Sequence, residues 1–225
     1  EIRAVQEAVL EARIPFEREL AVIAARSRTG EVEVYPLVET HHHEGILRYT
    51  LAPAPLLSPE KEEQAKESVT KILERFDKLR HANGSVSTAD LRLEMQKTMQ
   101  NHAAVFRTGE SIEKGLEKLR ALNDQMDDLK VTDRSMIWNT DLVETLELTN
   151  LMPQALATAQ SALNRTESRG AQARDDYPDR DDDNWMKHSL VSVNEKGDVT
   201  IDYRPVHMYT QTDDVEVIPP KPRVY

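Results

Sequence analysis

The 225-residue sequence contains no cysteine, only seven glycines and only 5% aromatic residues. Without cysteine, these residues cannot form disulfides, thiolate zinc sites, cysteine-bound iron–sulfur clusters or a cysteine nucleophile. The glycines are too scattered for a Gly-x-Gly-x-x-Gly fingerprint or a phosphate-binding loop. We therefore expect no dinucleotide-binding domain, and no cofactor bound by this chain alone.

Positive charge is also scarce, because 29 lysines and arginines stand against 40 acidic residues, a formal net charge of −11. Such an acidic chain is not expected to bind nucleic acid or an anionic membrane surface. No apolar run approaches the roughly 20 residues of a transmembrane helix, so we expect no direct membrane insertion. The chain has no signal-peptide pattern and does not begin with Met, which we interpret as an excised or processed piece.

Residues 1–57 are predicted to form a small β-rich fragment of α+β type. Glu19–Ser27 and Glu31–Val38 have strand character and are joined at Gly30, which favours a hairpin. Gly45–Leu51 reads as a third strand. Valines alternate with polar residues in the second run, so one face of the sheet is expected to be buried.

The sequence holds two clusters of potential metal ligands. His41, His42 and His43 are adjacent, but neighbouring side chains on a strand point to opposite faces and cannot converge on one ion. We interpret this run as a solvent-exposed loop. The acidic run at 175–183 lacks the central glycine and terminal glutamate of an EF-hand loop. No metal site is predicted in this chain.

Residues 58–165 are predicted to form an antiparallel helical bundle, which makes the fold mainly α. Three amphipathic segments begin at Ser58, at Ser87 or Thr88, and at Ser111, with short connections between them. Each apolar stripe must be buried, and a bundle does this. The first stripe comprises Ala65, Val69, Ile72, Phe76 and Leu79, and the second runs from Leu91 through Met95 to Val105.

A fourth, longer helix is predicted from Asn139 or Thr140 to about Asn164. Pro153 lies inside it. Proline removes one backbone hydrogen bond and clashes with the preceding turn, at a cost of roughly 3 kcal/mol in a helix interior. The sequence therefore predicts a kink or a break at Asn150–Met152.

Residues 166–225 form the third predicted region. Thr166–His188 is dense in charge and has no helical or strand period. A charge run of this kind is usually a solvated loop, but Tyr177 and Trp185 indicate a segment pressed onto another surface. A C-terminal hairpin follows, with its turn at Glu195-Lys196-Gly197-Asp198, and then a proline-rich tail.

Several motifs occur in one order between residues 68 and 225. They are Leu79–Ser85, Met95–Arg107, Trp138–Leu148, Glu167–Ala171, Pro178–Asp182, Asn184-Trp185 and Pro219–Tyr225. Together they closely resemble the C-terminal part of the succinate dehydrogenase flavoprotein subunit. One departure is Gln172, which stands where that family has histidine.

This resemblance implies a supporting role in citric-acid-cycle and electron-transport machinery. The region would contact the flavin-binding and capping domains and the iron–sulfur subunit through an interface of Arg169, Arg174, Tyr177, Arg180 and Trp185. The full-length family uses FAD, but its catalytic groups lie upstream of the matched region. We therefore assign no catalytic residue and predict that this chain alone is inactive. The implied location is cytoplasmic, peripheral to the bacterial inner membrane through partner subunits, or the mitochondrial matrix side.

A second set of motifs lies in residues 1–65 and includes Val9–Glu11, Ile14–Leu20, Val34–Pro36 and Gly45–Arg48. It resembles the central ATP-grasp segment of 5-(carboxyamino)imidazole ribonucleotide synthase, a purine-biosynthesis ligase that uses ATP and Mg²⁺. The nucleotide-binding residues implied by that resemblance are Glu11, Ala12, Arg13 and Ile14 as the adenine hinge, Glu19 for the ribose hydroxyls, and His42. The family's phosphate-clamping lysines and acidic metal ligands are not matched, so phosphoryl transfer has no electrostatic support and no ligase activity is expected.

Three functions therefore remain open from the sequence. They are a supporting domain of succinate dehydrogenase, a truncated ATP-grasp fragment that binds ATP, and an acidic helical adaptor related to neither family. The two resemblances meet near residues 60–70 without a Gly/Ser linker, as in a chimera. The motifs at 167–185 favour the first function, and the unmatched phosphate and metal ligands weigh against the second.

Overall fold

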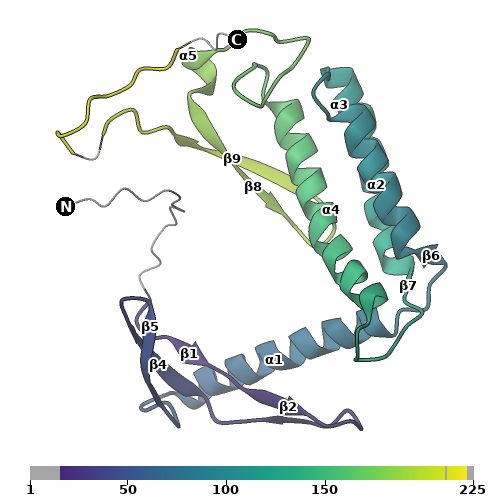
Figure 1. Cartoon of the computed structure of the whole chain (residues 1–225), viewed down its shortest axis with the longest axis vertical. Helices are drawn as coiled ribbons and strands as arrows, with labels where there is room; N and C mark the ends of the chain where they lie inside the picture. The colour runs from purple at the N-terminus through teal and green to yellow at the C-terminus, as the bar shows by residue number, and fades with distance from the viewer. Residues whose placement is uncertain (1–15, 211, 222–225) are drawn as a thin grey trace. The chain divides into compact units, whose positions relative to one another are not determined.

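The computed structural model describes residues 16–210 and 212–221 and divides the chain into two compact units (Figure 1). Unit 1 is Glu1–Phe76 and unit 2 is Asp77–Tyr225. The described residues form both helices and small sheets, so the fold class is α+β. No described helix is long and apolar enough to cross a membrane.

Unit 1 holds two small antiparallel arrangements. A three-stranded sheet has the order β1-β4-β5, and β2 pairs with β3 as a two-stranded ribbon. The strands are β1 (Leu20–Ala21), β2 (Ala24–Arg26), β3 (Val32–Val34), β4 (Val38–His43) and β5 (Ile46–Leu51). The predicted hairpin at Gly30 is confirmed, and its glycine has a φ of 98°, which other residues adopt only with strain.

The expectation of a histidine loop is wrong, because His41 and His42 lie within β4 and His43 ends it. The strand continues through them because β5 pairs with this segment, with a bulge between His41 and His42. Glu44 and Gly45 close the β4–β5 turn with positive φ angles of 53° and 74°. Two residues with positive φ are what a tight hairpin turn requires, so the Glu-Gly pair was the overlooked signal.

Burial in unit 1 is slight. Among its described residues only Leu37 and Ala54 are buried, and every residue of β5 is exposed. The predicted buried face is therefore not present in this unit, where Val32 is 38% exposed. One small sheet supplies a single layer, whereas a hydrophobic core needs two packed layers.

Helix α1 (Pro59–Arg80) begins where the sequence predicts, with Ser58 Oγ accepting from the Lys61 N–H at 3.3 Å. Its predicted buried stripe is wrong, since α1 has no buried residue and Ile72 is 67% exposed. The helix is supported locally, by its cap and by i,i+4 ion pairs such as Lys66–Glu62 at 2.8 Å. Because α1 contributes nothing to the core cluster, the predicted antiparallel bundle that includes it is not confirmed.

The contrast in burial gives a prediction for hydrogen exchange. Amides in residues 16–51 should exchange quickly and those in 88–164 slowly, because opening unit 1 exposes little apolar surface. Native-state exchange followed by mass spectrometry would measure both ranges in one experiment. Equal protection of the two ranges would contradict this expectation.

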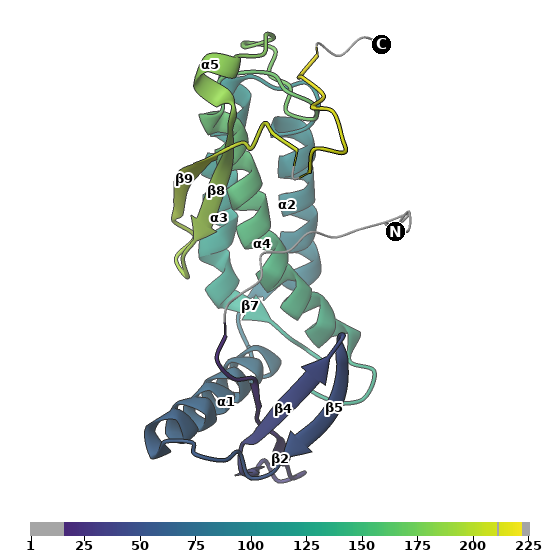
Figure 2. The same cartoon turned by 90° about the vertical axis from the view of Figure 1, so that its left-hand side faces the viewer.

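Unit 2 is built on α2 (Thr88–His102), α3 (Gly109–Asp124) and α4 (Thr140–Asn164), which lie side by side in both views (Figures 1 and 2). Each has a side-chain N-cap: Ser87, Thr108 and Asn139 accept hydrogen bonds from backbone N–H groups at 3.4, 3.3 and 2.8 Å. The predicted starts of α2 and α4 are confirmed. Helix α3 begins at Gly109, two residues earlier than predicted, because Thr108 rather than Ser111 is the cap.

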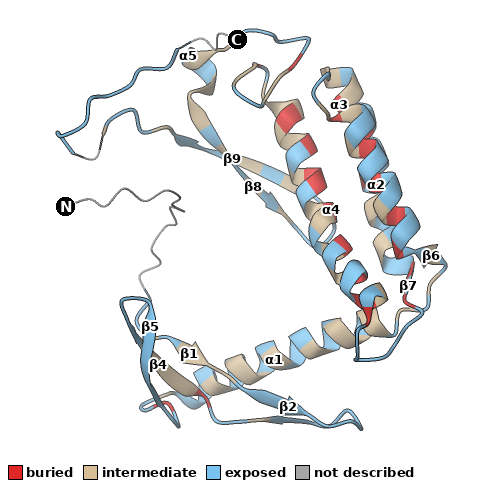
Figure 3. Ribbon diagram, viewed as in Figure 1, coloured by how far each residue is buried: buried red, intermediate tan, exposed pale blue. Residues whose placement is uncertain are grey.

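The hydrophobic core lies between these helices, along their facing sides (Figure 3). Its members that are at most 1% exposed are Ile112, Leu116, Leu119, Leu148, Met152, Leu156 and Ala159. Gly115 allows the close approach of α2 and α3, since a Cβ there would lie 2.6 Å from the Cβ of His102. The predicted stripe fails at its end, because α2 stops at His102 and leaves Val105 71% exposed.

Of the kink or break predicted at Asn150–Met152, the break does not occur, and α4 continues through Pro153 as one helix. Proline still lacks the N–H that would reach the carbonyl four residues earlier. The neighbours of Pro153 are buried, Met152 completely and Leu156 to 1% exposure. Burial of each such side chain stabilises the helical conformation by about 1.5–3 kcal/mol, which offsets the cost of the proline.

Short elements complete unit 2. They are β6 (Val86–Ser87), η1 (Gln125–Asp128), β7 (Leu129–Lys130), α5 (Asp182–Trp185), β8 (Lys187–Val193) and β9 (Val199–Pro205). The predicted C-terminal hairpin is confirmed as β8–β9, which packs on α4 (Figure 2), and its turn residue Gly197 has a φ of 83°. The segment between α4 and β8 was predicted to have no regular structure, but Asp181 caps the single turn of α5 by accepting from the Asn184 N–H at 3.0 Å.

Candidate interface built on a buried glutamate

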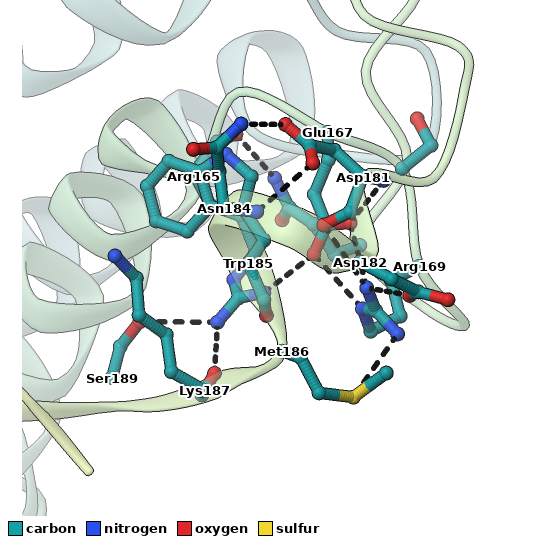
Figure 4. A network of polar contacts seen from close by, with 12 residues as sticks. Arg165, Glu167, Arg169, Asp181, Asp182, Asn184, Trp185, Met186, Lys187 and Ser189 are labelled. Atoms are coloured by element: carbon teal, nitrogen blue, oxygen red, sulfur yellow. Dashed lines mark hydrogen bonds and ion pairs between the residues drawn. The ribbon is translucent and has the colours of Figure 1, made fainter. Parts of the chain in front are cut away.

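The turn that follows α4 is organised around one buried carboxylate, Glu167, which is 0% exposed. Arg165 Nη1 donates to Glu167 Oε1 at 2.5 Å, and Arg169 donates to both carboxylate oxygens at 2.9 and 3.0 Å. The backbone N–H of Asp181 donates to Oε2 at 2.8 Å. We call these four residues the Glu167 node (Figure 4). A buried charge persists only when it is paired and hydrogen-bonded, so the node fixes where both arginines and α5 lie.

Electrostatics at the node favour the ionised carboxylate. Burial alone would raise the pKa of Glu167, but hydrogen bonds from Arg169, from the Asp181 N–H and from Arg165 outweigh it and hold this pKa below its ordinary value. The same hydrogen bond to Glu167, with a second to Asp182 at 2.6 Å, raises the pKa of Arg169. The node is therefore a charged, hydrogen-bonded structure at neutral pH.

Arg174 closes the C-terminal end of α4. Its Nη1 donates to the carbonyl oxygens of Ala162 and Leu163 at 3.1 and 3.0 Å, which helix termini otherwise leave unsatisfied. Its Nε and Nη2 each donate to Asp176 at 2.7 Å. Asp176 also accepts from the Gly109 N–H at 2.8 Å, at the start of α3. Arg174 and the Gly109 N–H hold the pKa of Asp176 well below its usual range, and this pair ties the loop to two helices.

Gln172, which stands where the resemblance expects histidine, also links the loop to α4. Its Nε2 donates to the carbonyls of Ala162 and Arg165 at 3.1 and 3.3 Å. Its Oε1 accepts from Arg107 Nη2 at 2.6 Å. Both ends of the side chain are hydrogen-bonded, so the departure from the family pattern leaves no unsatisfied amide.

The Trp185 indole packs against two cations and one aromatic ring. The Arg165 guanidinium lies 5.0 Å and the Lys187 ammonium 4.8 Å from the indole ring centre, and Tyr203 meets the indole edge-on at 6.1 Å. The indole N–H donates to Thr166 Oγ1 at 3.2 Å. Rings that are packed on cations and partly open to solvent are typical anchors of protein interfaces.

The five residues predicted as an interface all lie in this segment, but they differ in accessibility. Arg174 is 3% exposed and is occupied within the chain, whereas Tyr177 is 44% exposed and its ring carries the Arg174 guanidinium at 5.0 Å. The side chains of Arg169 and Arg180 are 28% and 29% exposed, and Trp185 is intermediate. Asp182 joins Arg169 at 2.6 Å and Arg180 at 3.0 Å. Arg169 and Arg180 are therefore held in position by an acidic partner.

The nucleotide-binding candidates are only partly placed. Glu11, Ala12, Arg13 and Ile14 lie outside the described residues. Glu19 and His42 are brought together, with His42 Nδ1 3.0 Å from Glu19 Oε2. Within the described ranges, no group of three or more His, Asp or Glu residues could hold a metal ion.

Sequence reasoning assigned no role to Glu167, Arg165 or Asp176. The signal for the first two was the spacing Arg165-x-Glu167-x-Arg169, because residues two apart in an extended segment share one side. Two guanidinium groups beside one carboxylate then form a compensated node. Arg174 and Asp176 have the same spacing, but the contact of Asp176 with the Gly109 N–H arises only from the packing of the loop on α3.

Comparison with known proteins finds two families, which match different parts of the chain. The family model described as fumarate reductase flavoprotein C-term matches residues 92–225, and a model described as ATP-grasp domain matches residues 2–80. The succinate dehydrogenase flavoprotein subunit of Rickettsia felis is 56% identical over 158 residues, which are 70% of this chain and 26% of that protein. This chain therefore spans about a quarter of the length of the curated relatives it matches.

Two of the solved structures similar to this chain also come from these two groups of proteins. The FrdA chain of a mutant E. coli quinol fumarate reductase has a TM-score of 0.63 and 30% identity, covering 71% of this chain and 27% of that one. The N5-carboxyaminoimidazole ribonucleotide synthetase of Thermus thermophilus is 46% identical over 30% of this chain and 19% of its own, but its TM-score of 0.29 supports no structural conclusion. Because one family model covers residues 92–225, which is more than half of the 225 residues, the chain belongs to the fumarate reductase flavoprotein C-terminal family.

Proposed function

We propose that this chain is the C-terminal supporting part of a succinate dehydrogenase flavoprotein subunit. Its role would be to hold the flavin-binding and capping domains and to contact the iron–sulfur subunit. The relatives at 55–56% identity carry that subunit's name, and this chain corresponds to about a quarter of their length. The flavoprotein name implies FAD. In this proposal FAD binds to the part of the relatives that this chain does not cover. The scattered glycines here offer no phosphate-binding loop for it.

The observation that supports the proposal most is the rigid presentation of the 166–187 segment. Arg169, Arg180 and Trp185 are positioned by the Glu167 node and by Asp182 rather than left in a mobile loop. An interface whose side chains are already ordered loses less conformational entropy on binding. The segment is thus built as a recognition surface and contains no group that we assign to catalysis.

Co-purification tests this proposal. The chain would be expressed with a truncated Rickettsia felis relative that keeps the flavin-binding and capping domains but has its C-terminal quarter removed. The iron–sulfur subunit would be expressed with both. We expect a complex, and we expect Trp185→Ala to weaken it by roughly 30-fold, because buried aromatic anchors contribute about 2 kcal/mol or more. Tyr35→Ala in unit 1, an exposed aromatic residue, is the control and should bind like the parent chain. A folded chain that forms no complex would refute the proposal.

The ATP-binding alternative has less support. Glu19, the proposed ribose ligand, is already in contact with His42, and the adenine hinge lies outside the described residues. The ATP-grasp match ends at residue 80 and covers a minority of the chain. We therefore propose that this ATP-grasp segment does not contribute to complex formation. The variant Glu19→Gln should leave complex formation unchanged.

A further inference from the structure

A basic pocket lies beside the Glu167 node, between the C-terminal half of α4 and the start of β8. Its volume is about 630 Å³, and its lining includes five potential cations and no acidic side chain. The five are Arg107, Arg165, Arg169, Lys187 and His188. This local positive charge stands in a chain whose net charge is −11, so the concentration of bases at one pocket requires an explanation.

Two of these cations are already paired with acids. Arg165 and Arg169 share the buried carboxylate of Glu167, and Arg169 also pairs with Asp182. These contacts engage both guanidinium groups, and their remaining role is to shape the wall of the pocket. They cannot by themselves account for an affinity for anions.

The other two strong bases have no carboxylate partner among the described residues. Arg107 donates to the carbonyl oxygens of Ala103 and Ala173 at 2.9 and 3.0 Å and to the Gln172 amide oxygen at 2.6 Å, all of them neutral acceptors. The Lys187 ammonium lies 4.0 Å from the Tyr203 ring centre and 4.8 Å from that of Trp185. Neither cation is therefore neutralised by an acidic side chain among the described residues, and both residues line the pocket.

The surroundings of Arg107 also make its positive charge unfavourable without an anionic partner. Burial, together with the positive charge of Arg174 nearby, holds the pKa of Arg107 below its ordinary value. A guanidinium stays charged in proteins even so. Partial desolvation without a counter-charge is unfavourable, and an incoming carboxylate would relieve it by a charge-assisted hydrogen bond.

We propose that this pocket is a socket for acidic side chains of the partner polypeptide, received between Arg107 and Lys187. The inference rests on the proposed function, because it names the chemistry by which the flavin-binding and capping portion meets this surface. A polypeptide partner is favoured over a free dicarboxylate because the pocket adjoins the ordered segment Tyr177–Trp185, so one partner surface can cover both. Charge complementarity of this kind sets register and association rate.

The test is a titration of the isolated full-length chain, so its outcome does not depend on forming the complex. The ¹⁵N-labelled chain receives the blocked peptide Ac-Gly-Glu-Asp-Gly-NH2, with Ac-Gly-Gln-Asn-Gly-NH2 as the uncharged control. We expect saturable amide shifts around Ser161, Gln172 and Lys187 with the acidic peptide alone, abolished by high salt because the contact is electrostatic. No shift, or equal shifts with both peptides, would overturn the proposal.

Variants separate charge from packing. Lys187→Gln should weaken peptide binding about tenfold, whereas Lys187→Arg, which keeps the cation, should restore it. Lys196→Gln removes the same charge from the turn of the same hairpin, outside the pocket, and should have no effect. Equal losses of peptide affinity in Lys187→Gln and Lys187→Arg would show that Lys187 acts through packing. That result would overturn its proposed role as a cation that binds the carboxylate.

A third arm distinguishes the source of the carboxylate. Succinate, added at the same concentration, should shift the same amides more weakly than the peptide. Succinate that binds as tightly as the peptide would assign the socket to a small dicarboxylate and overturn the polypeptide partner. If the co-purification fails while this titration succeeds, the proposed function fails and the socket itself stands.

Discussion

Glu167→Gln should destabilise unit 2 by about 3 kcal/mol or more, because removing one member of a buried ion pair leaves the other charges uncompensated. The substitution keeps the volume, but both carboxylate oxygens accept hydrogen bonds here, from Arg165, Arg169 and the Asp181 N–H. Whichever way the new amide is turned, its NH2 group faces donors. Urea unfolding followed by circular dichroism measures the loss, and the matched control Glu113→Gln, an exposed residue of α3, should stay within about 0.5 kcal/mol.

The same variant carries a pH signature. The folded-state pKa of Glu167 is lowered, so its contribution is fully present above the ordinary glutamate pKa of about 4.3 and is lost as the pH falls through the folded value. The stability difference between the parent chain and Glu167→Gln should therefore be constant from pH 7 to about 5 and shrink below about 4.3. A difference that does not change with pH down to the acid transition would mean that folding does not shift the pKa of Glu167.

Leu156→Ala should cost about 3–4 kcal/mol, within the range of 2–5 kcal/mol for a large-to-small change in a rigid core. Leu156 is 1% exposed and belongs to the core cluster. It also reaches the β8–β9 turn, since a Cβ on Gly197 would lie 3.2 Å from a Leu156 methyl group. The cavity would thus loosen both the helices and the hairpin that covers them.

Thermal melting of unit 2 provides the measurement, with an expected fall of roughly 2–4 °C per kcal/mol for a domain of this size. Leu93→Ala on α2, where the leucine is 47% exposed, is the control and should cost less than about 1 kcal/mol. A parent-like melting temperature for Leu156→Ala would contradict the packing of α4 against the hairpin.

Much of the fold of unit 2 could be predicted from local signals. The caps Ser87 and Asn139 and the turn at Gly197 act within a few residues of sequence, and the structure has them where predicted. The spacing of Leu91 and Met95 likewise predicted core residues, because helical periodicity reports which face is buried. Predictions of this kind succeed where local and tertiary preferences agree.

Two of the failures come from tertiary context. Pro153 was expected to kink or break α4, but the helix is not broken, because burial on both sides of the proline outweighs its local cost. The stripe of α1 was expected to be buried, yet periodicity cannot say whether a partner layer exists. In the site, the sequence singled out the segment 166–188 but not the Glu167 node. The spacing of Arg165, Glu167 and Arg169 is visible in the sequence, but the burial of the carboxylate and its hydrogen bond from the Asp181 N–H depend on the path of the loop.

The exposed character of α1 has a consequence for how far unit 2 depends on the residues before it. The ATP-grasp match ends with this helix at residue 80, and the flavoprotein match begins at residue 92, inside α2. A helix without a single buried side chain makes no demand on the shape of what precedes it. The core from Leu91 to Ala162 takes no member from α1. Replacing the first 76 residues with another folded domain should therefore leave the melting transition of unit 2 unchanged.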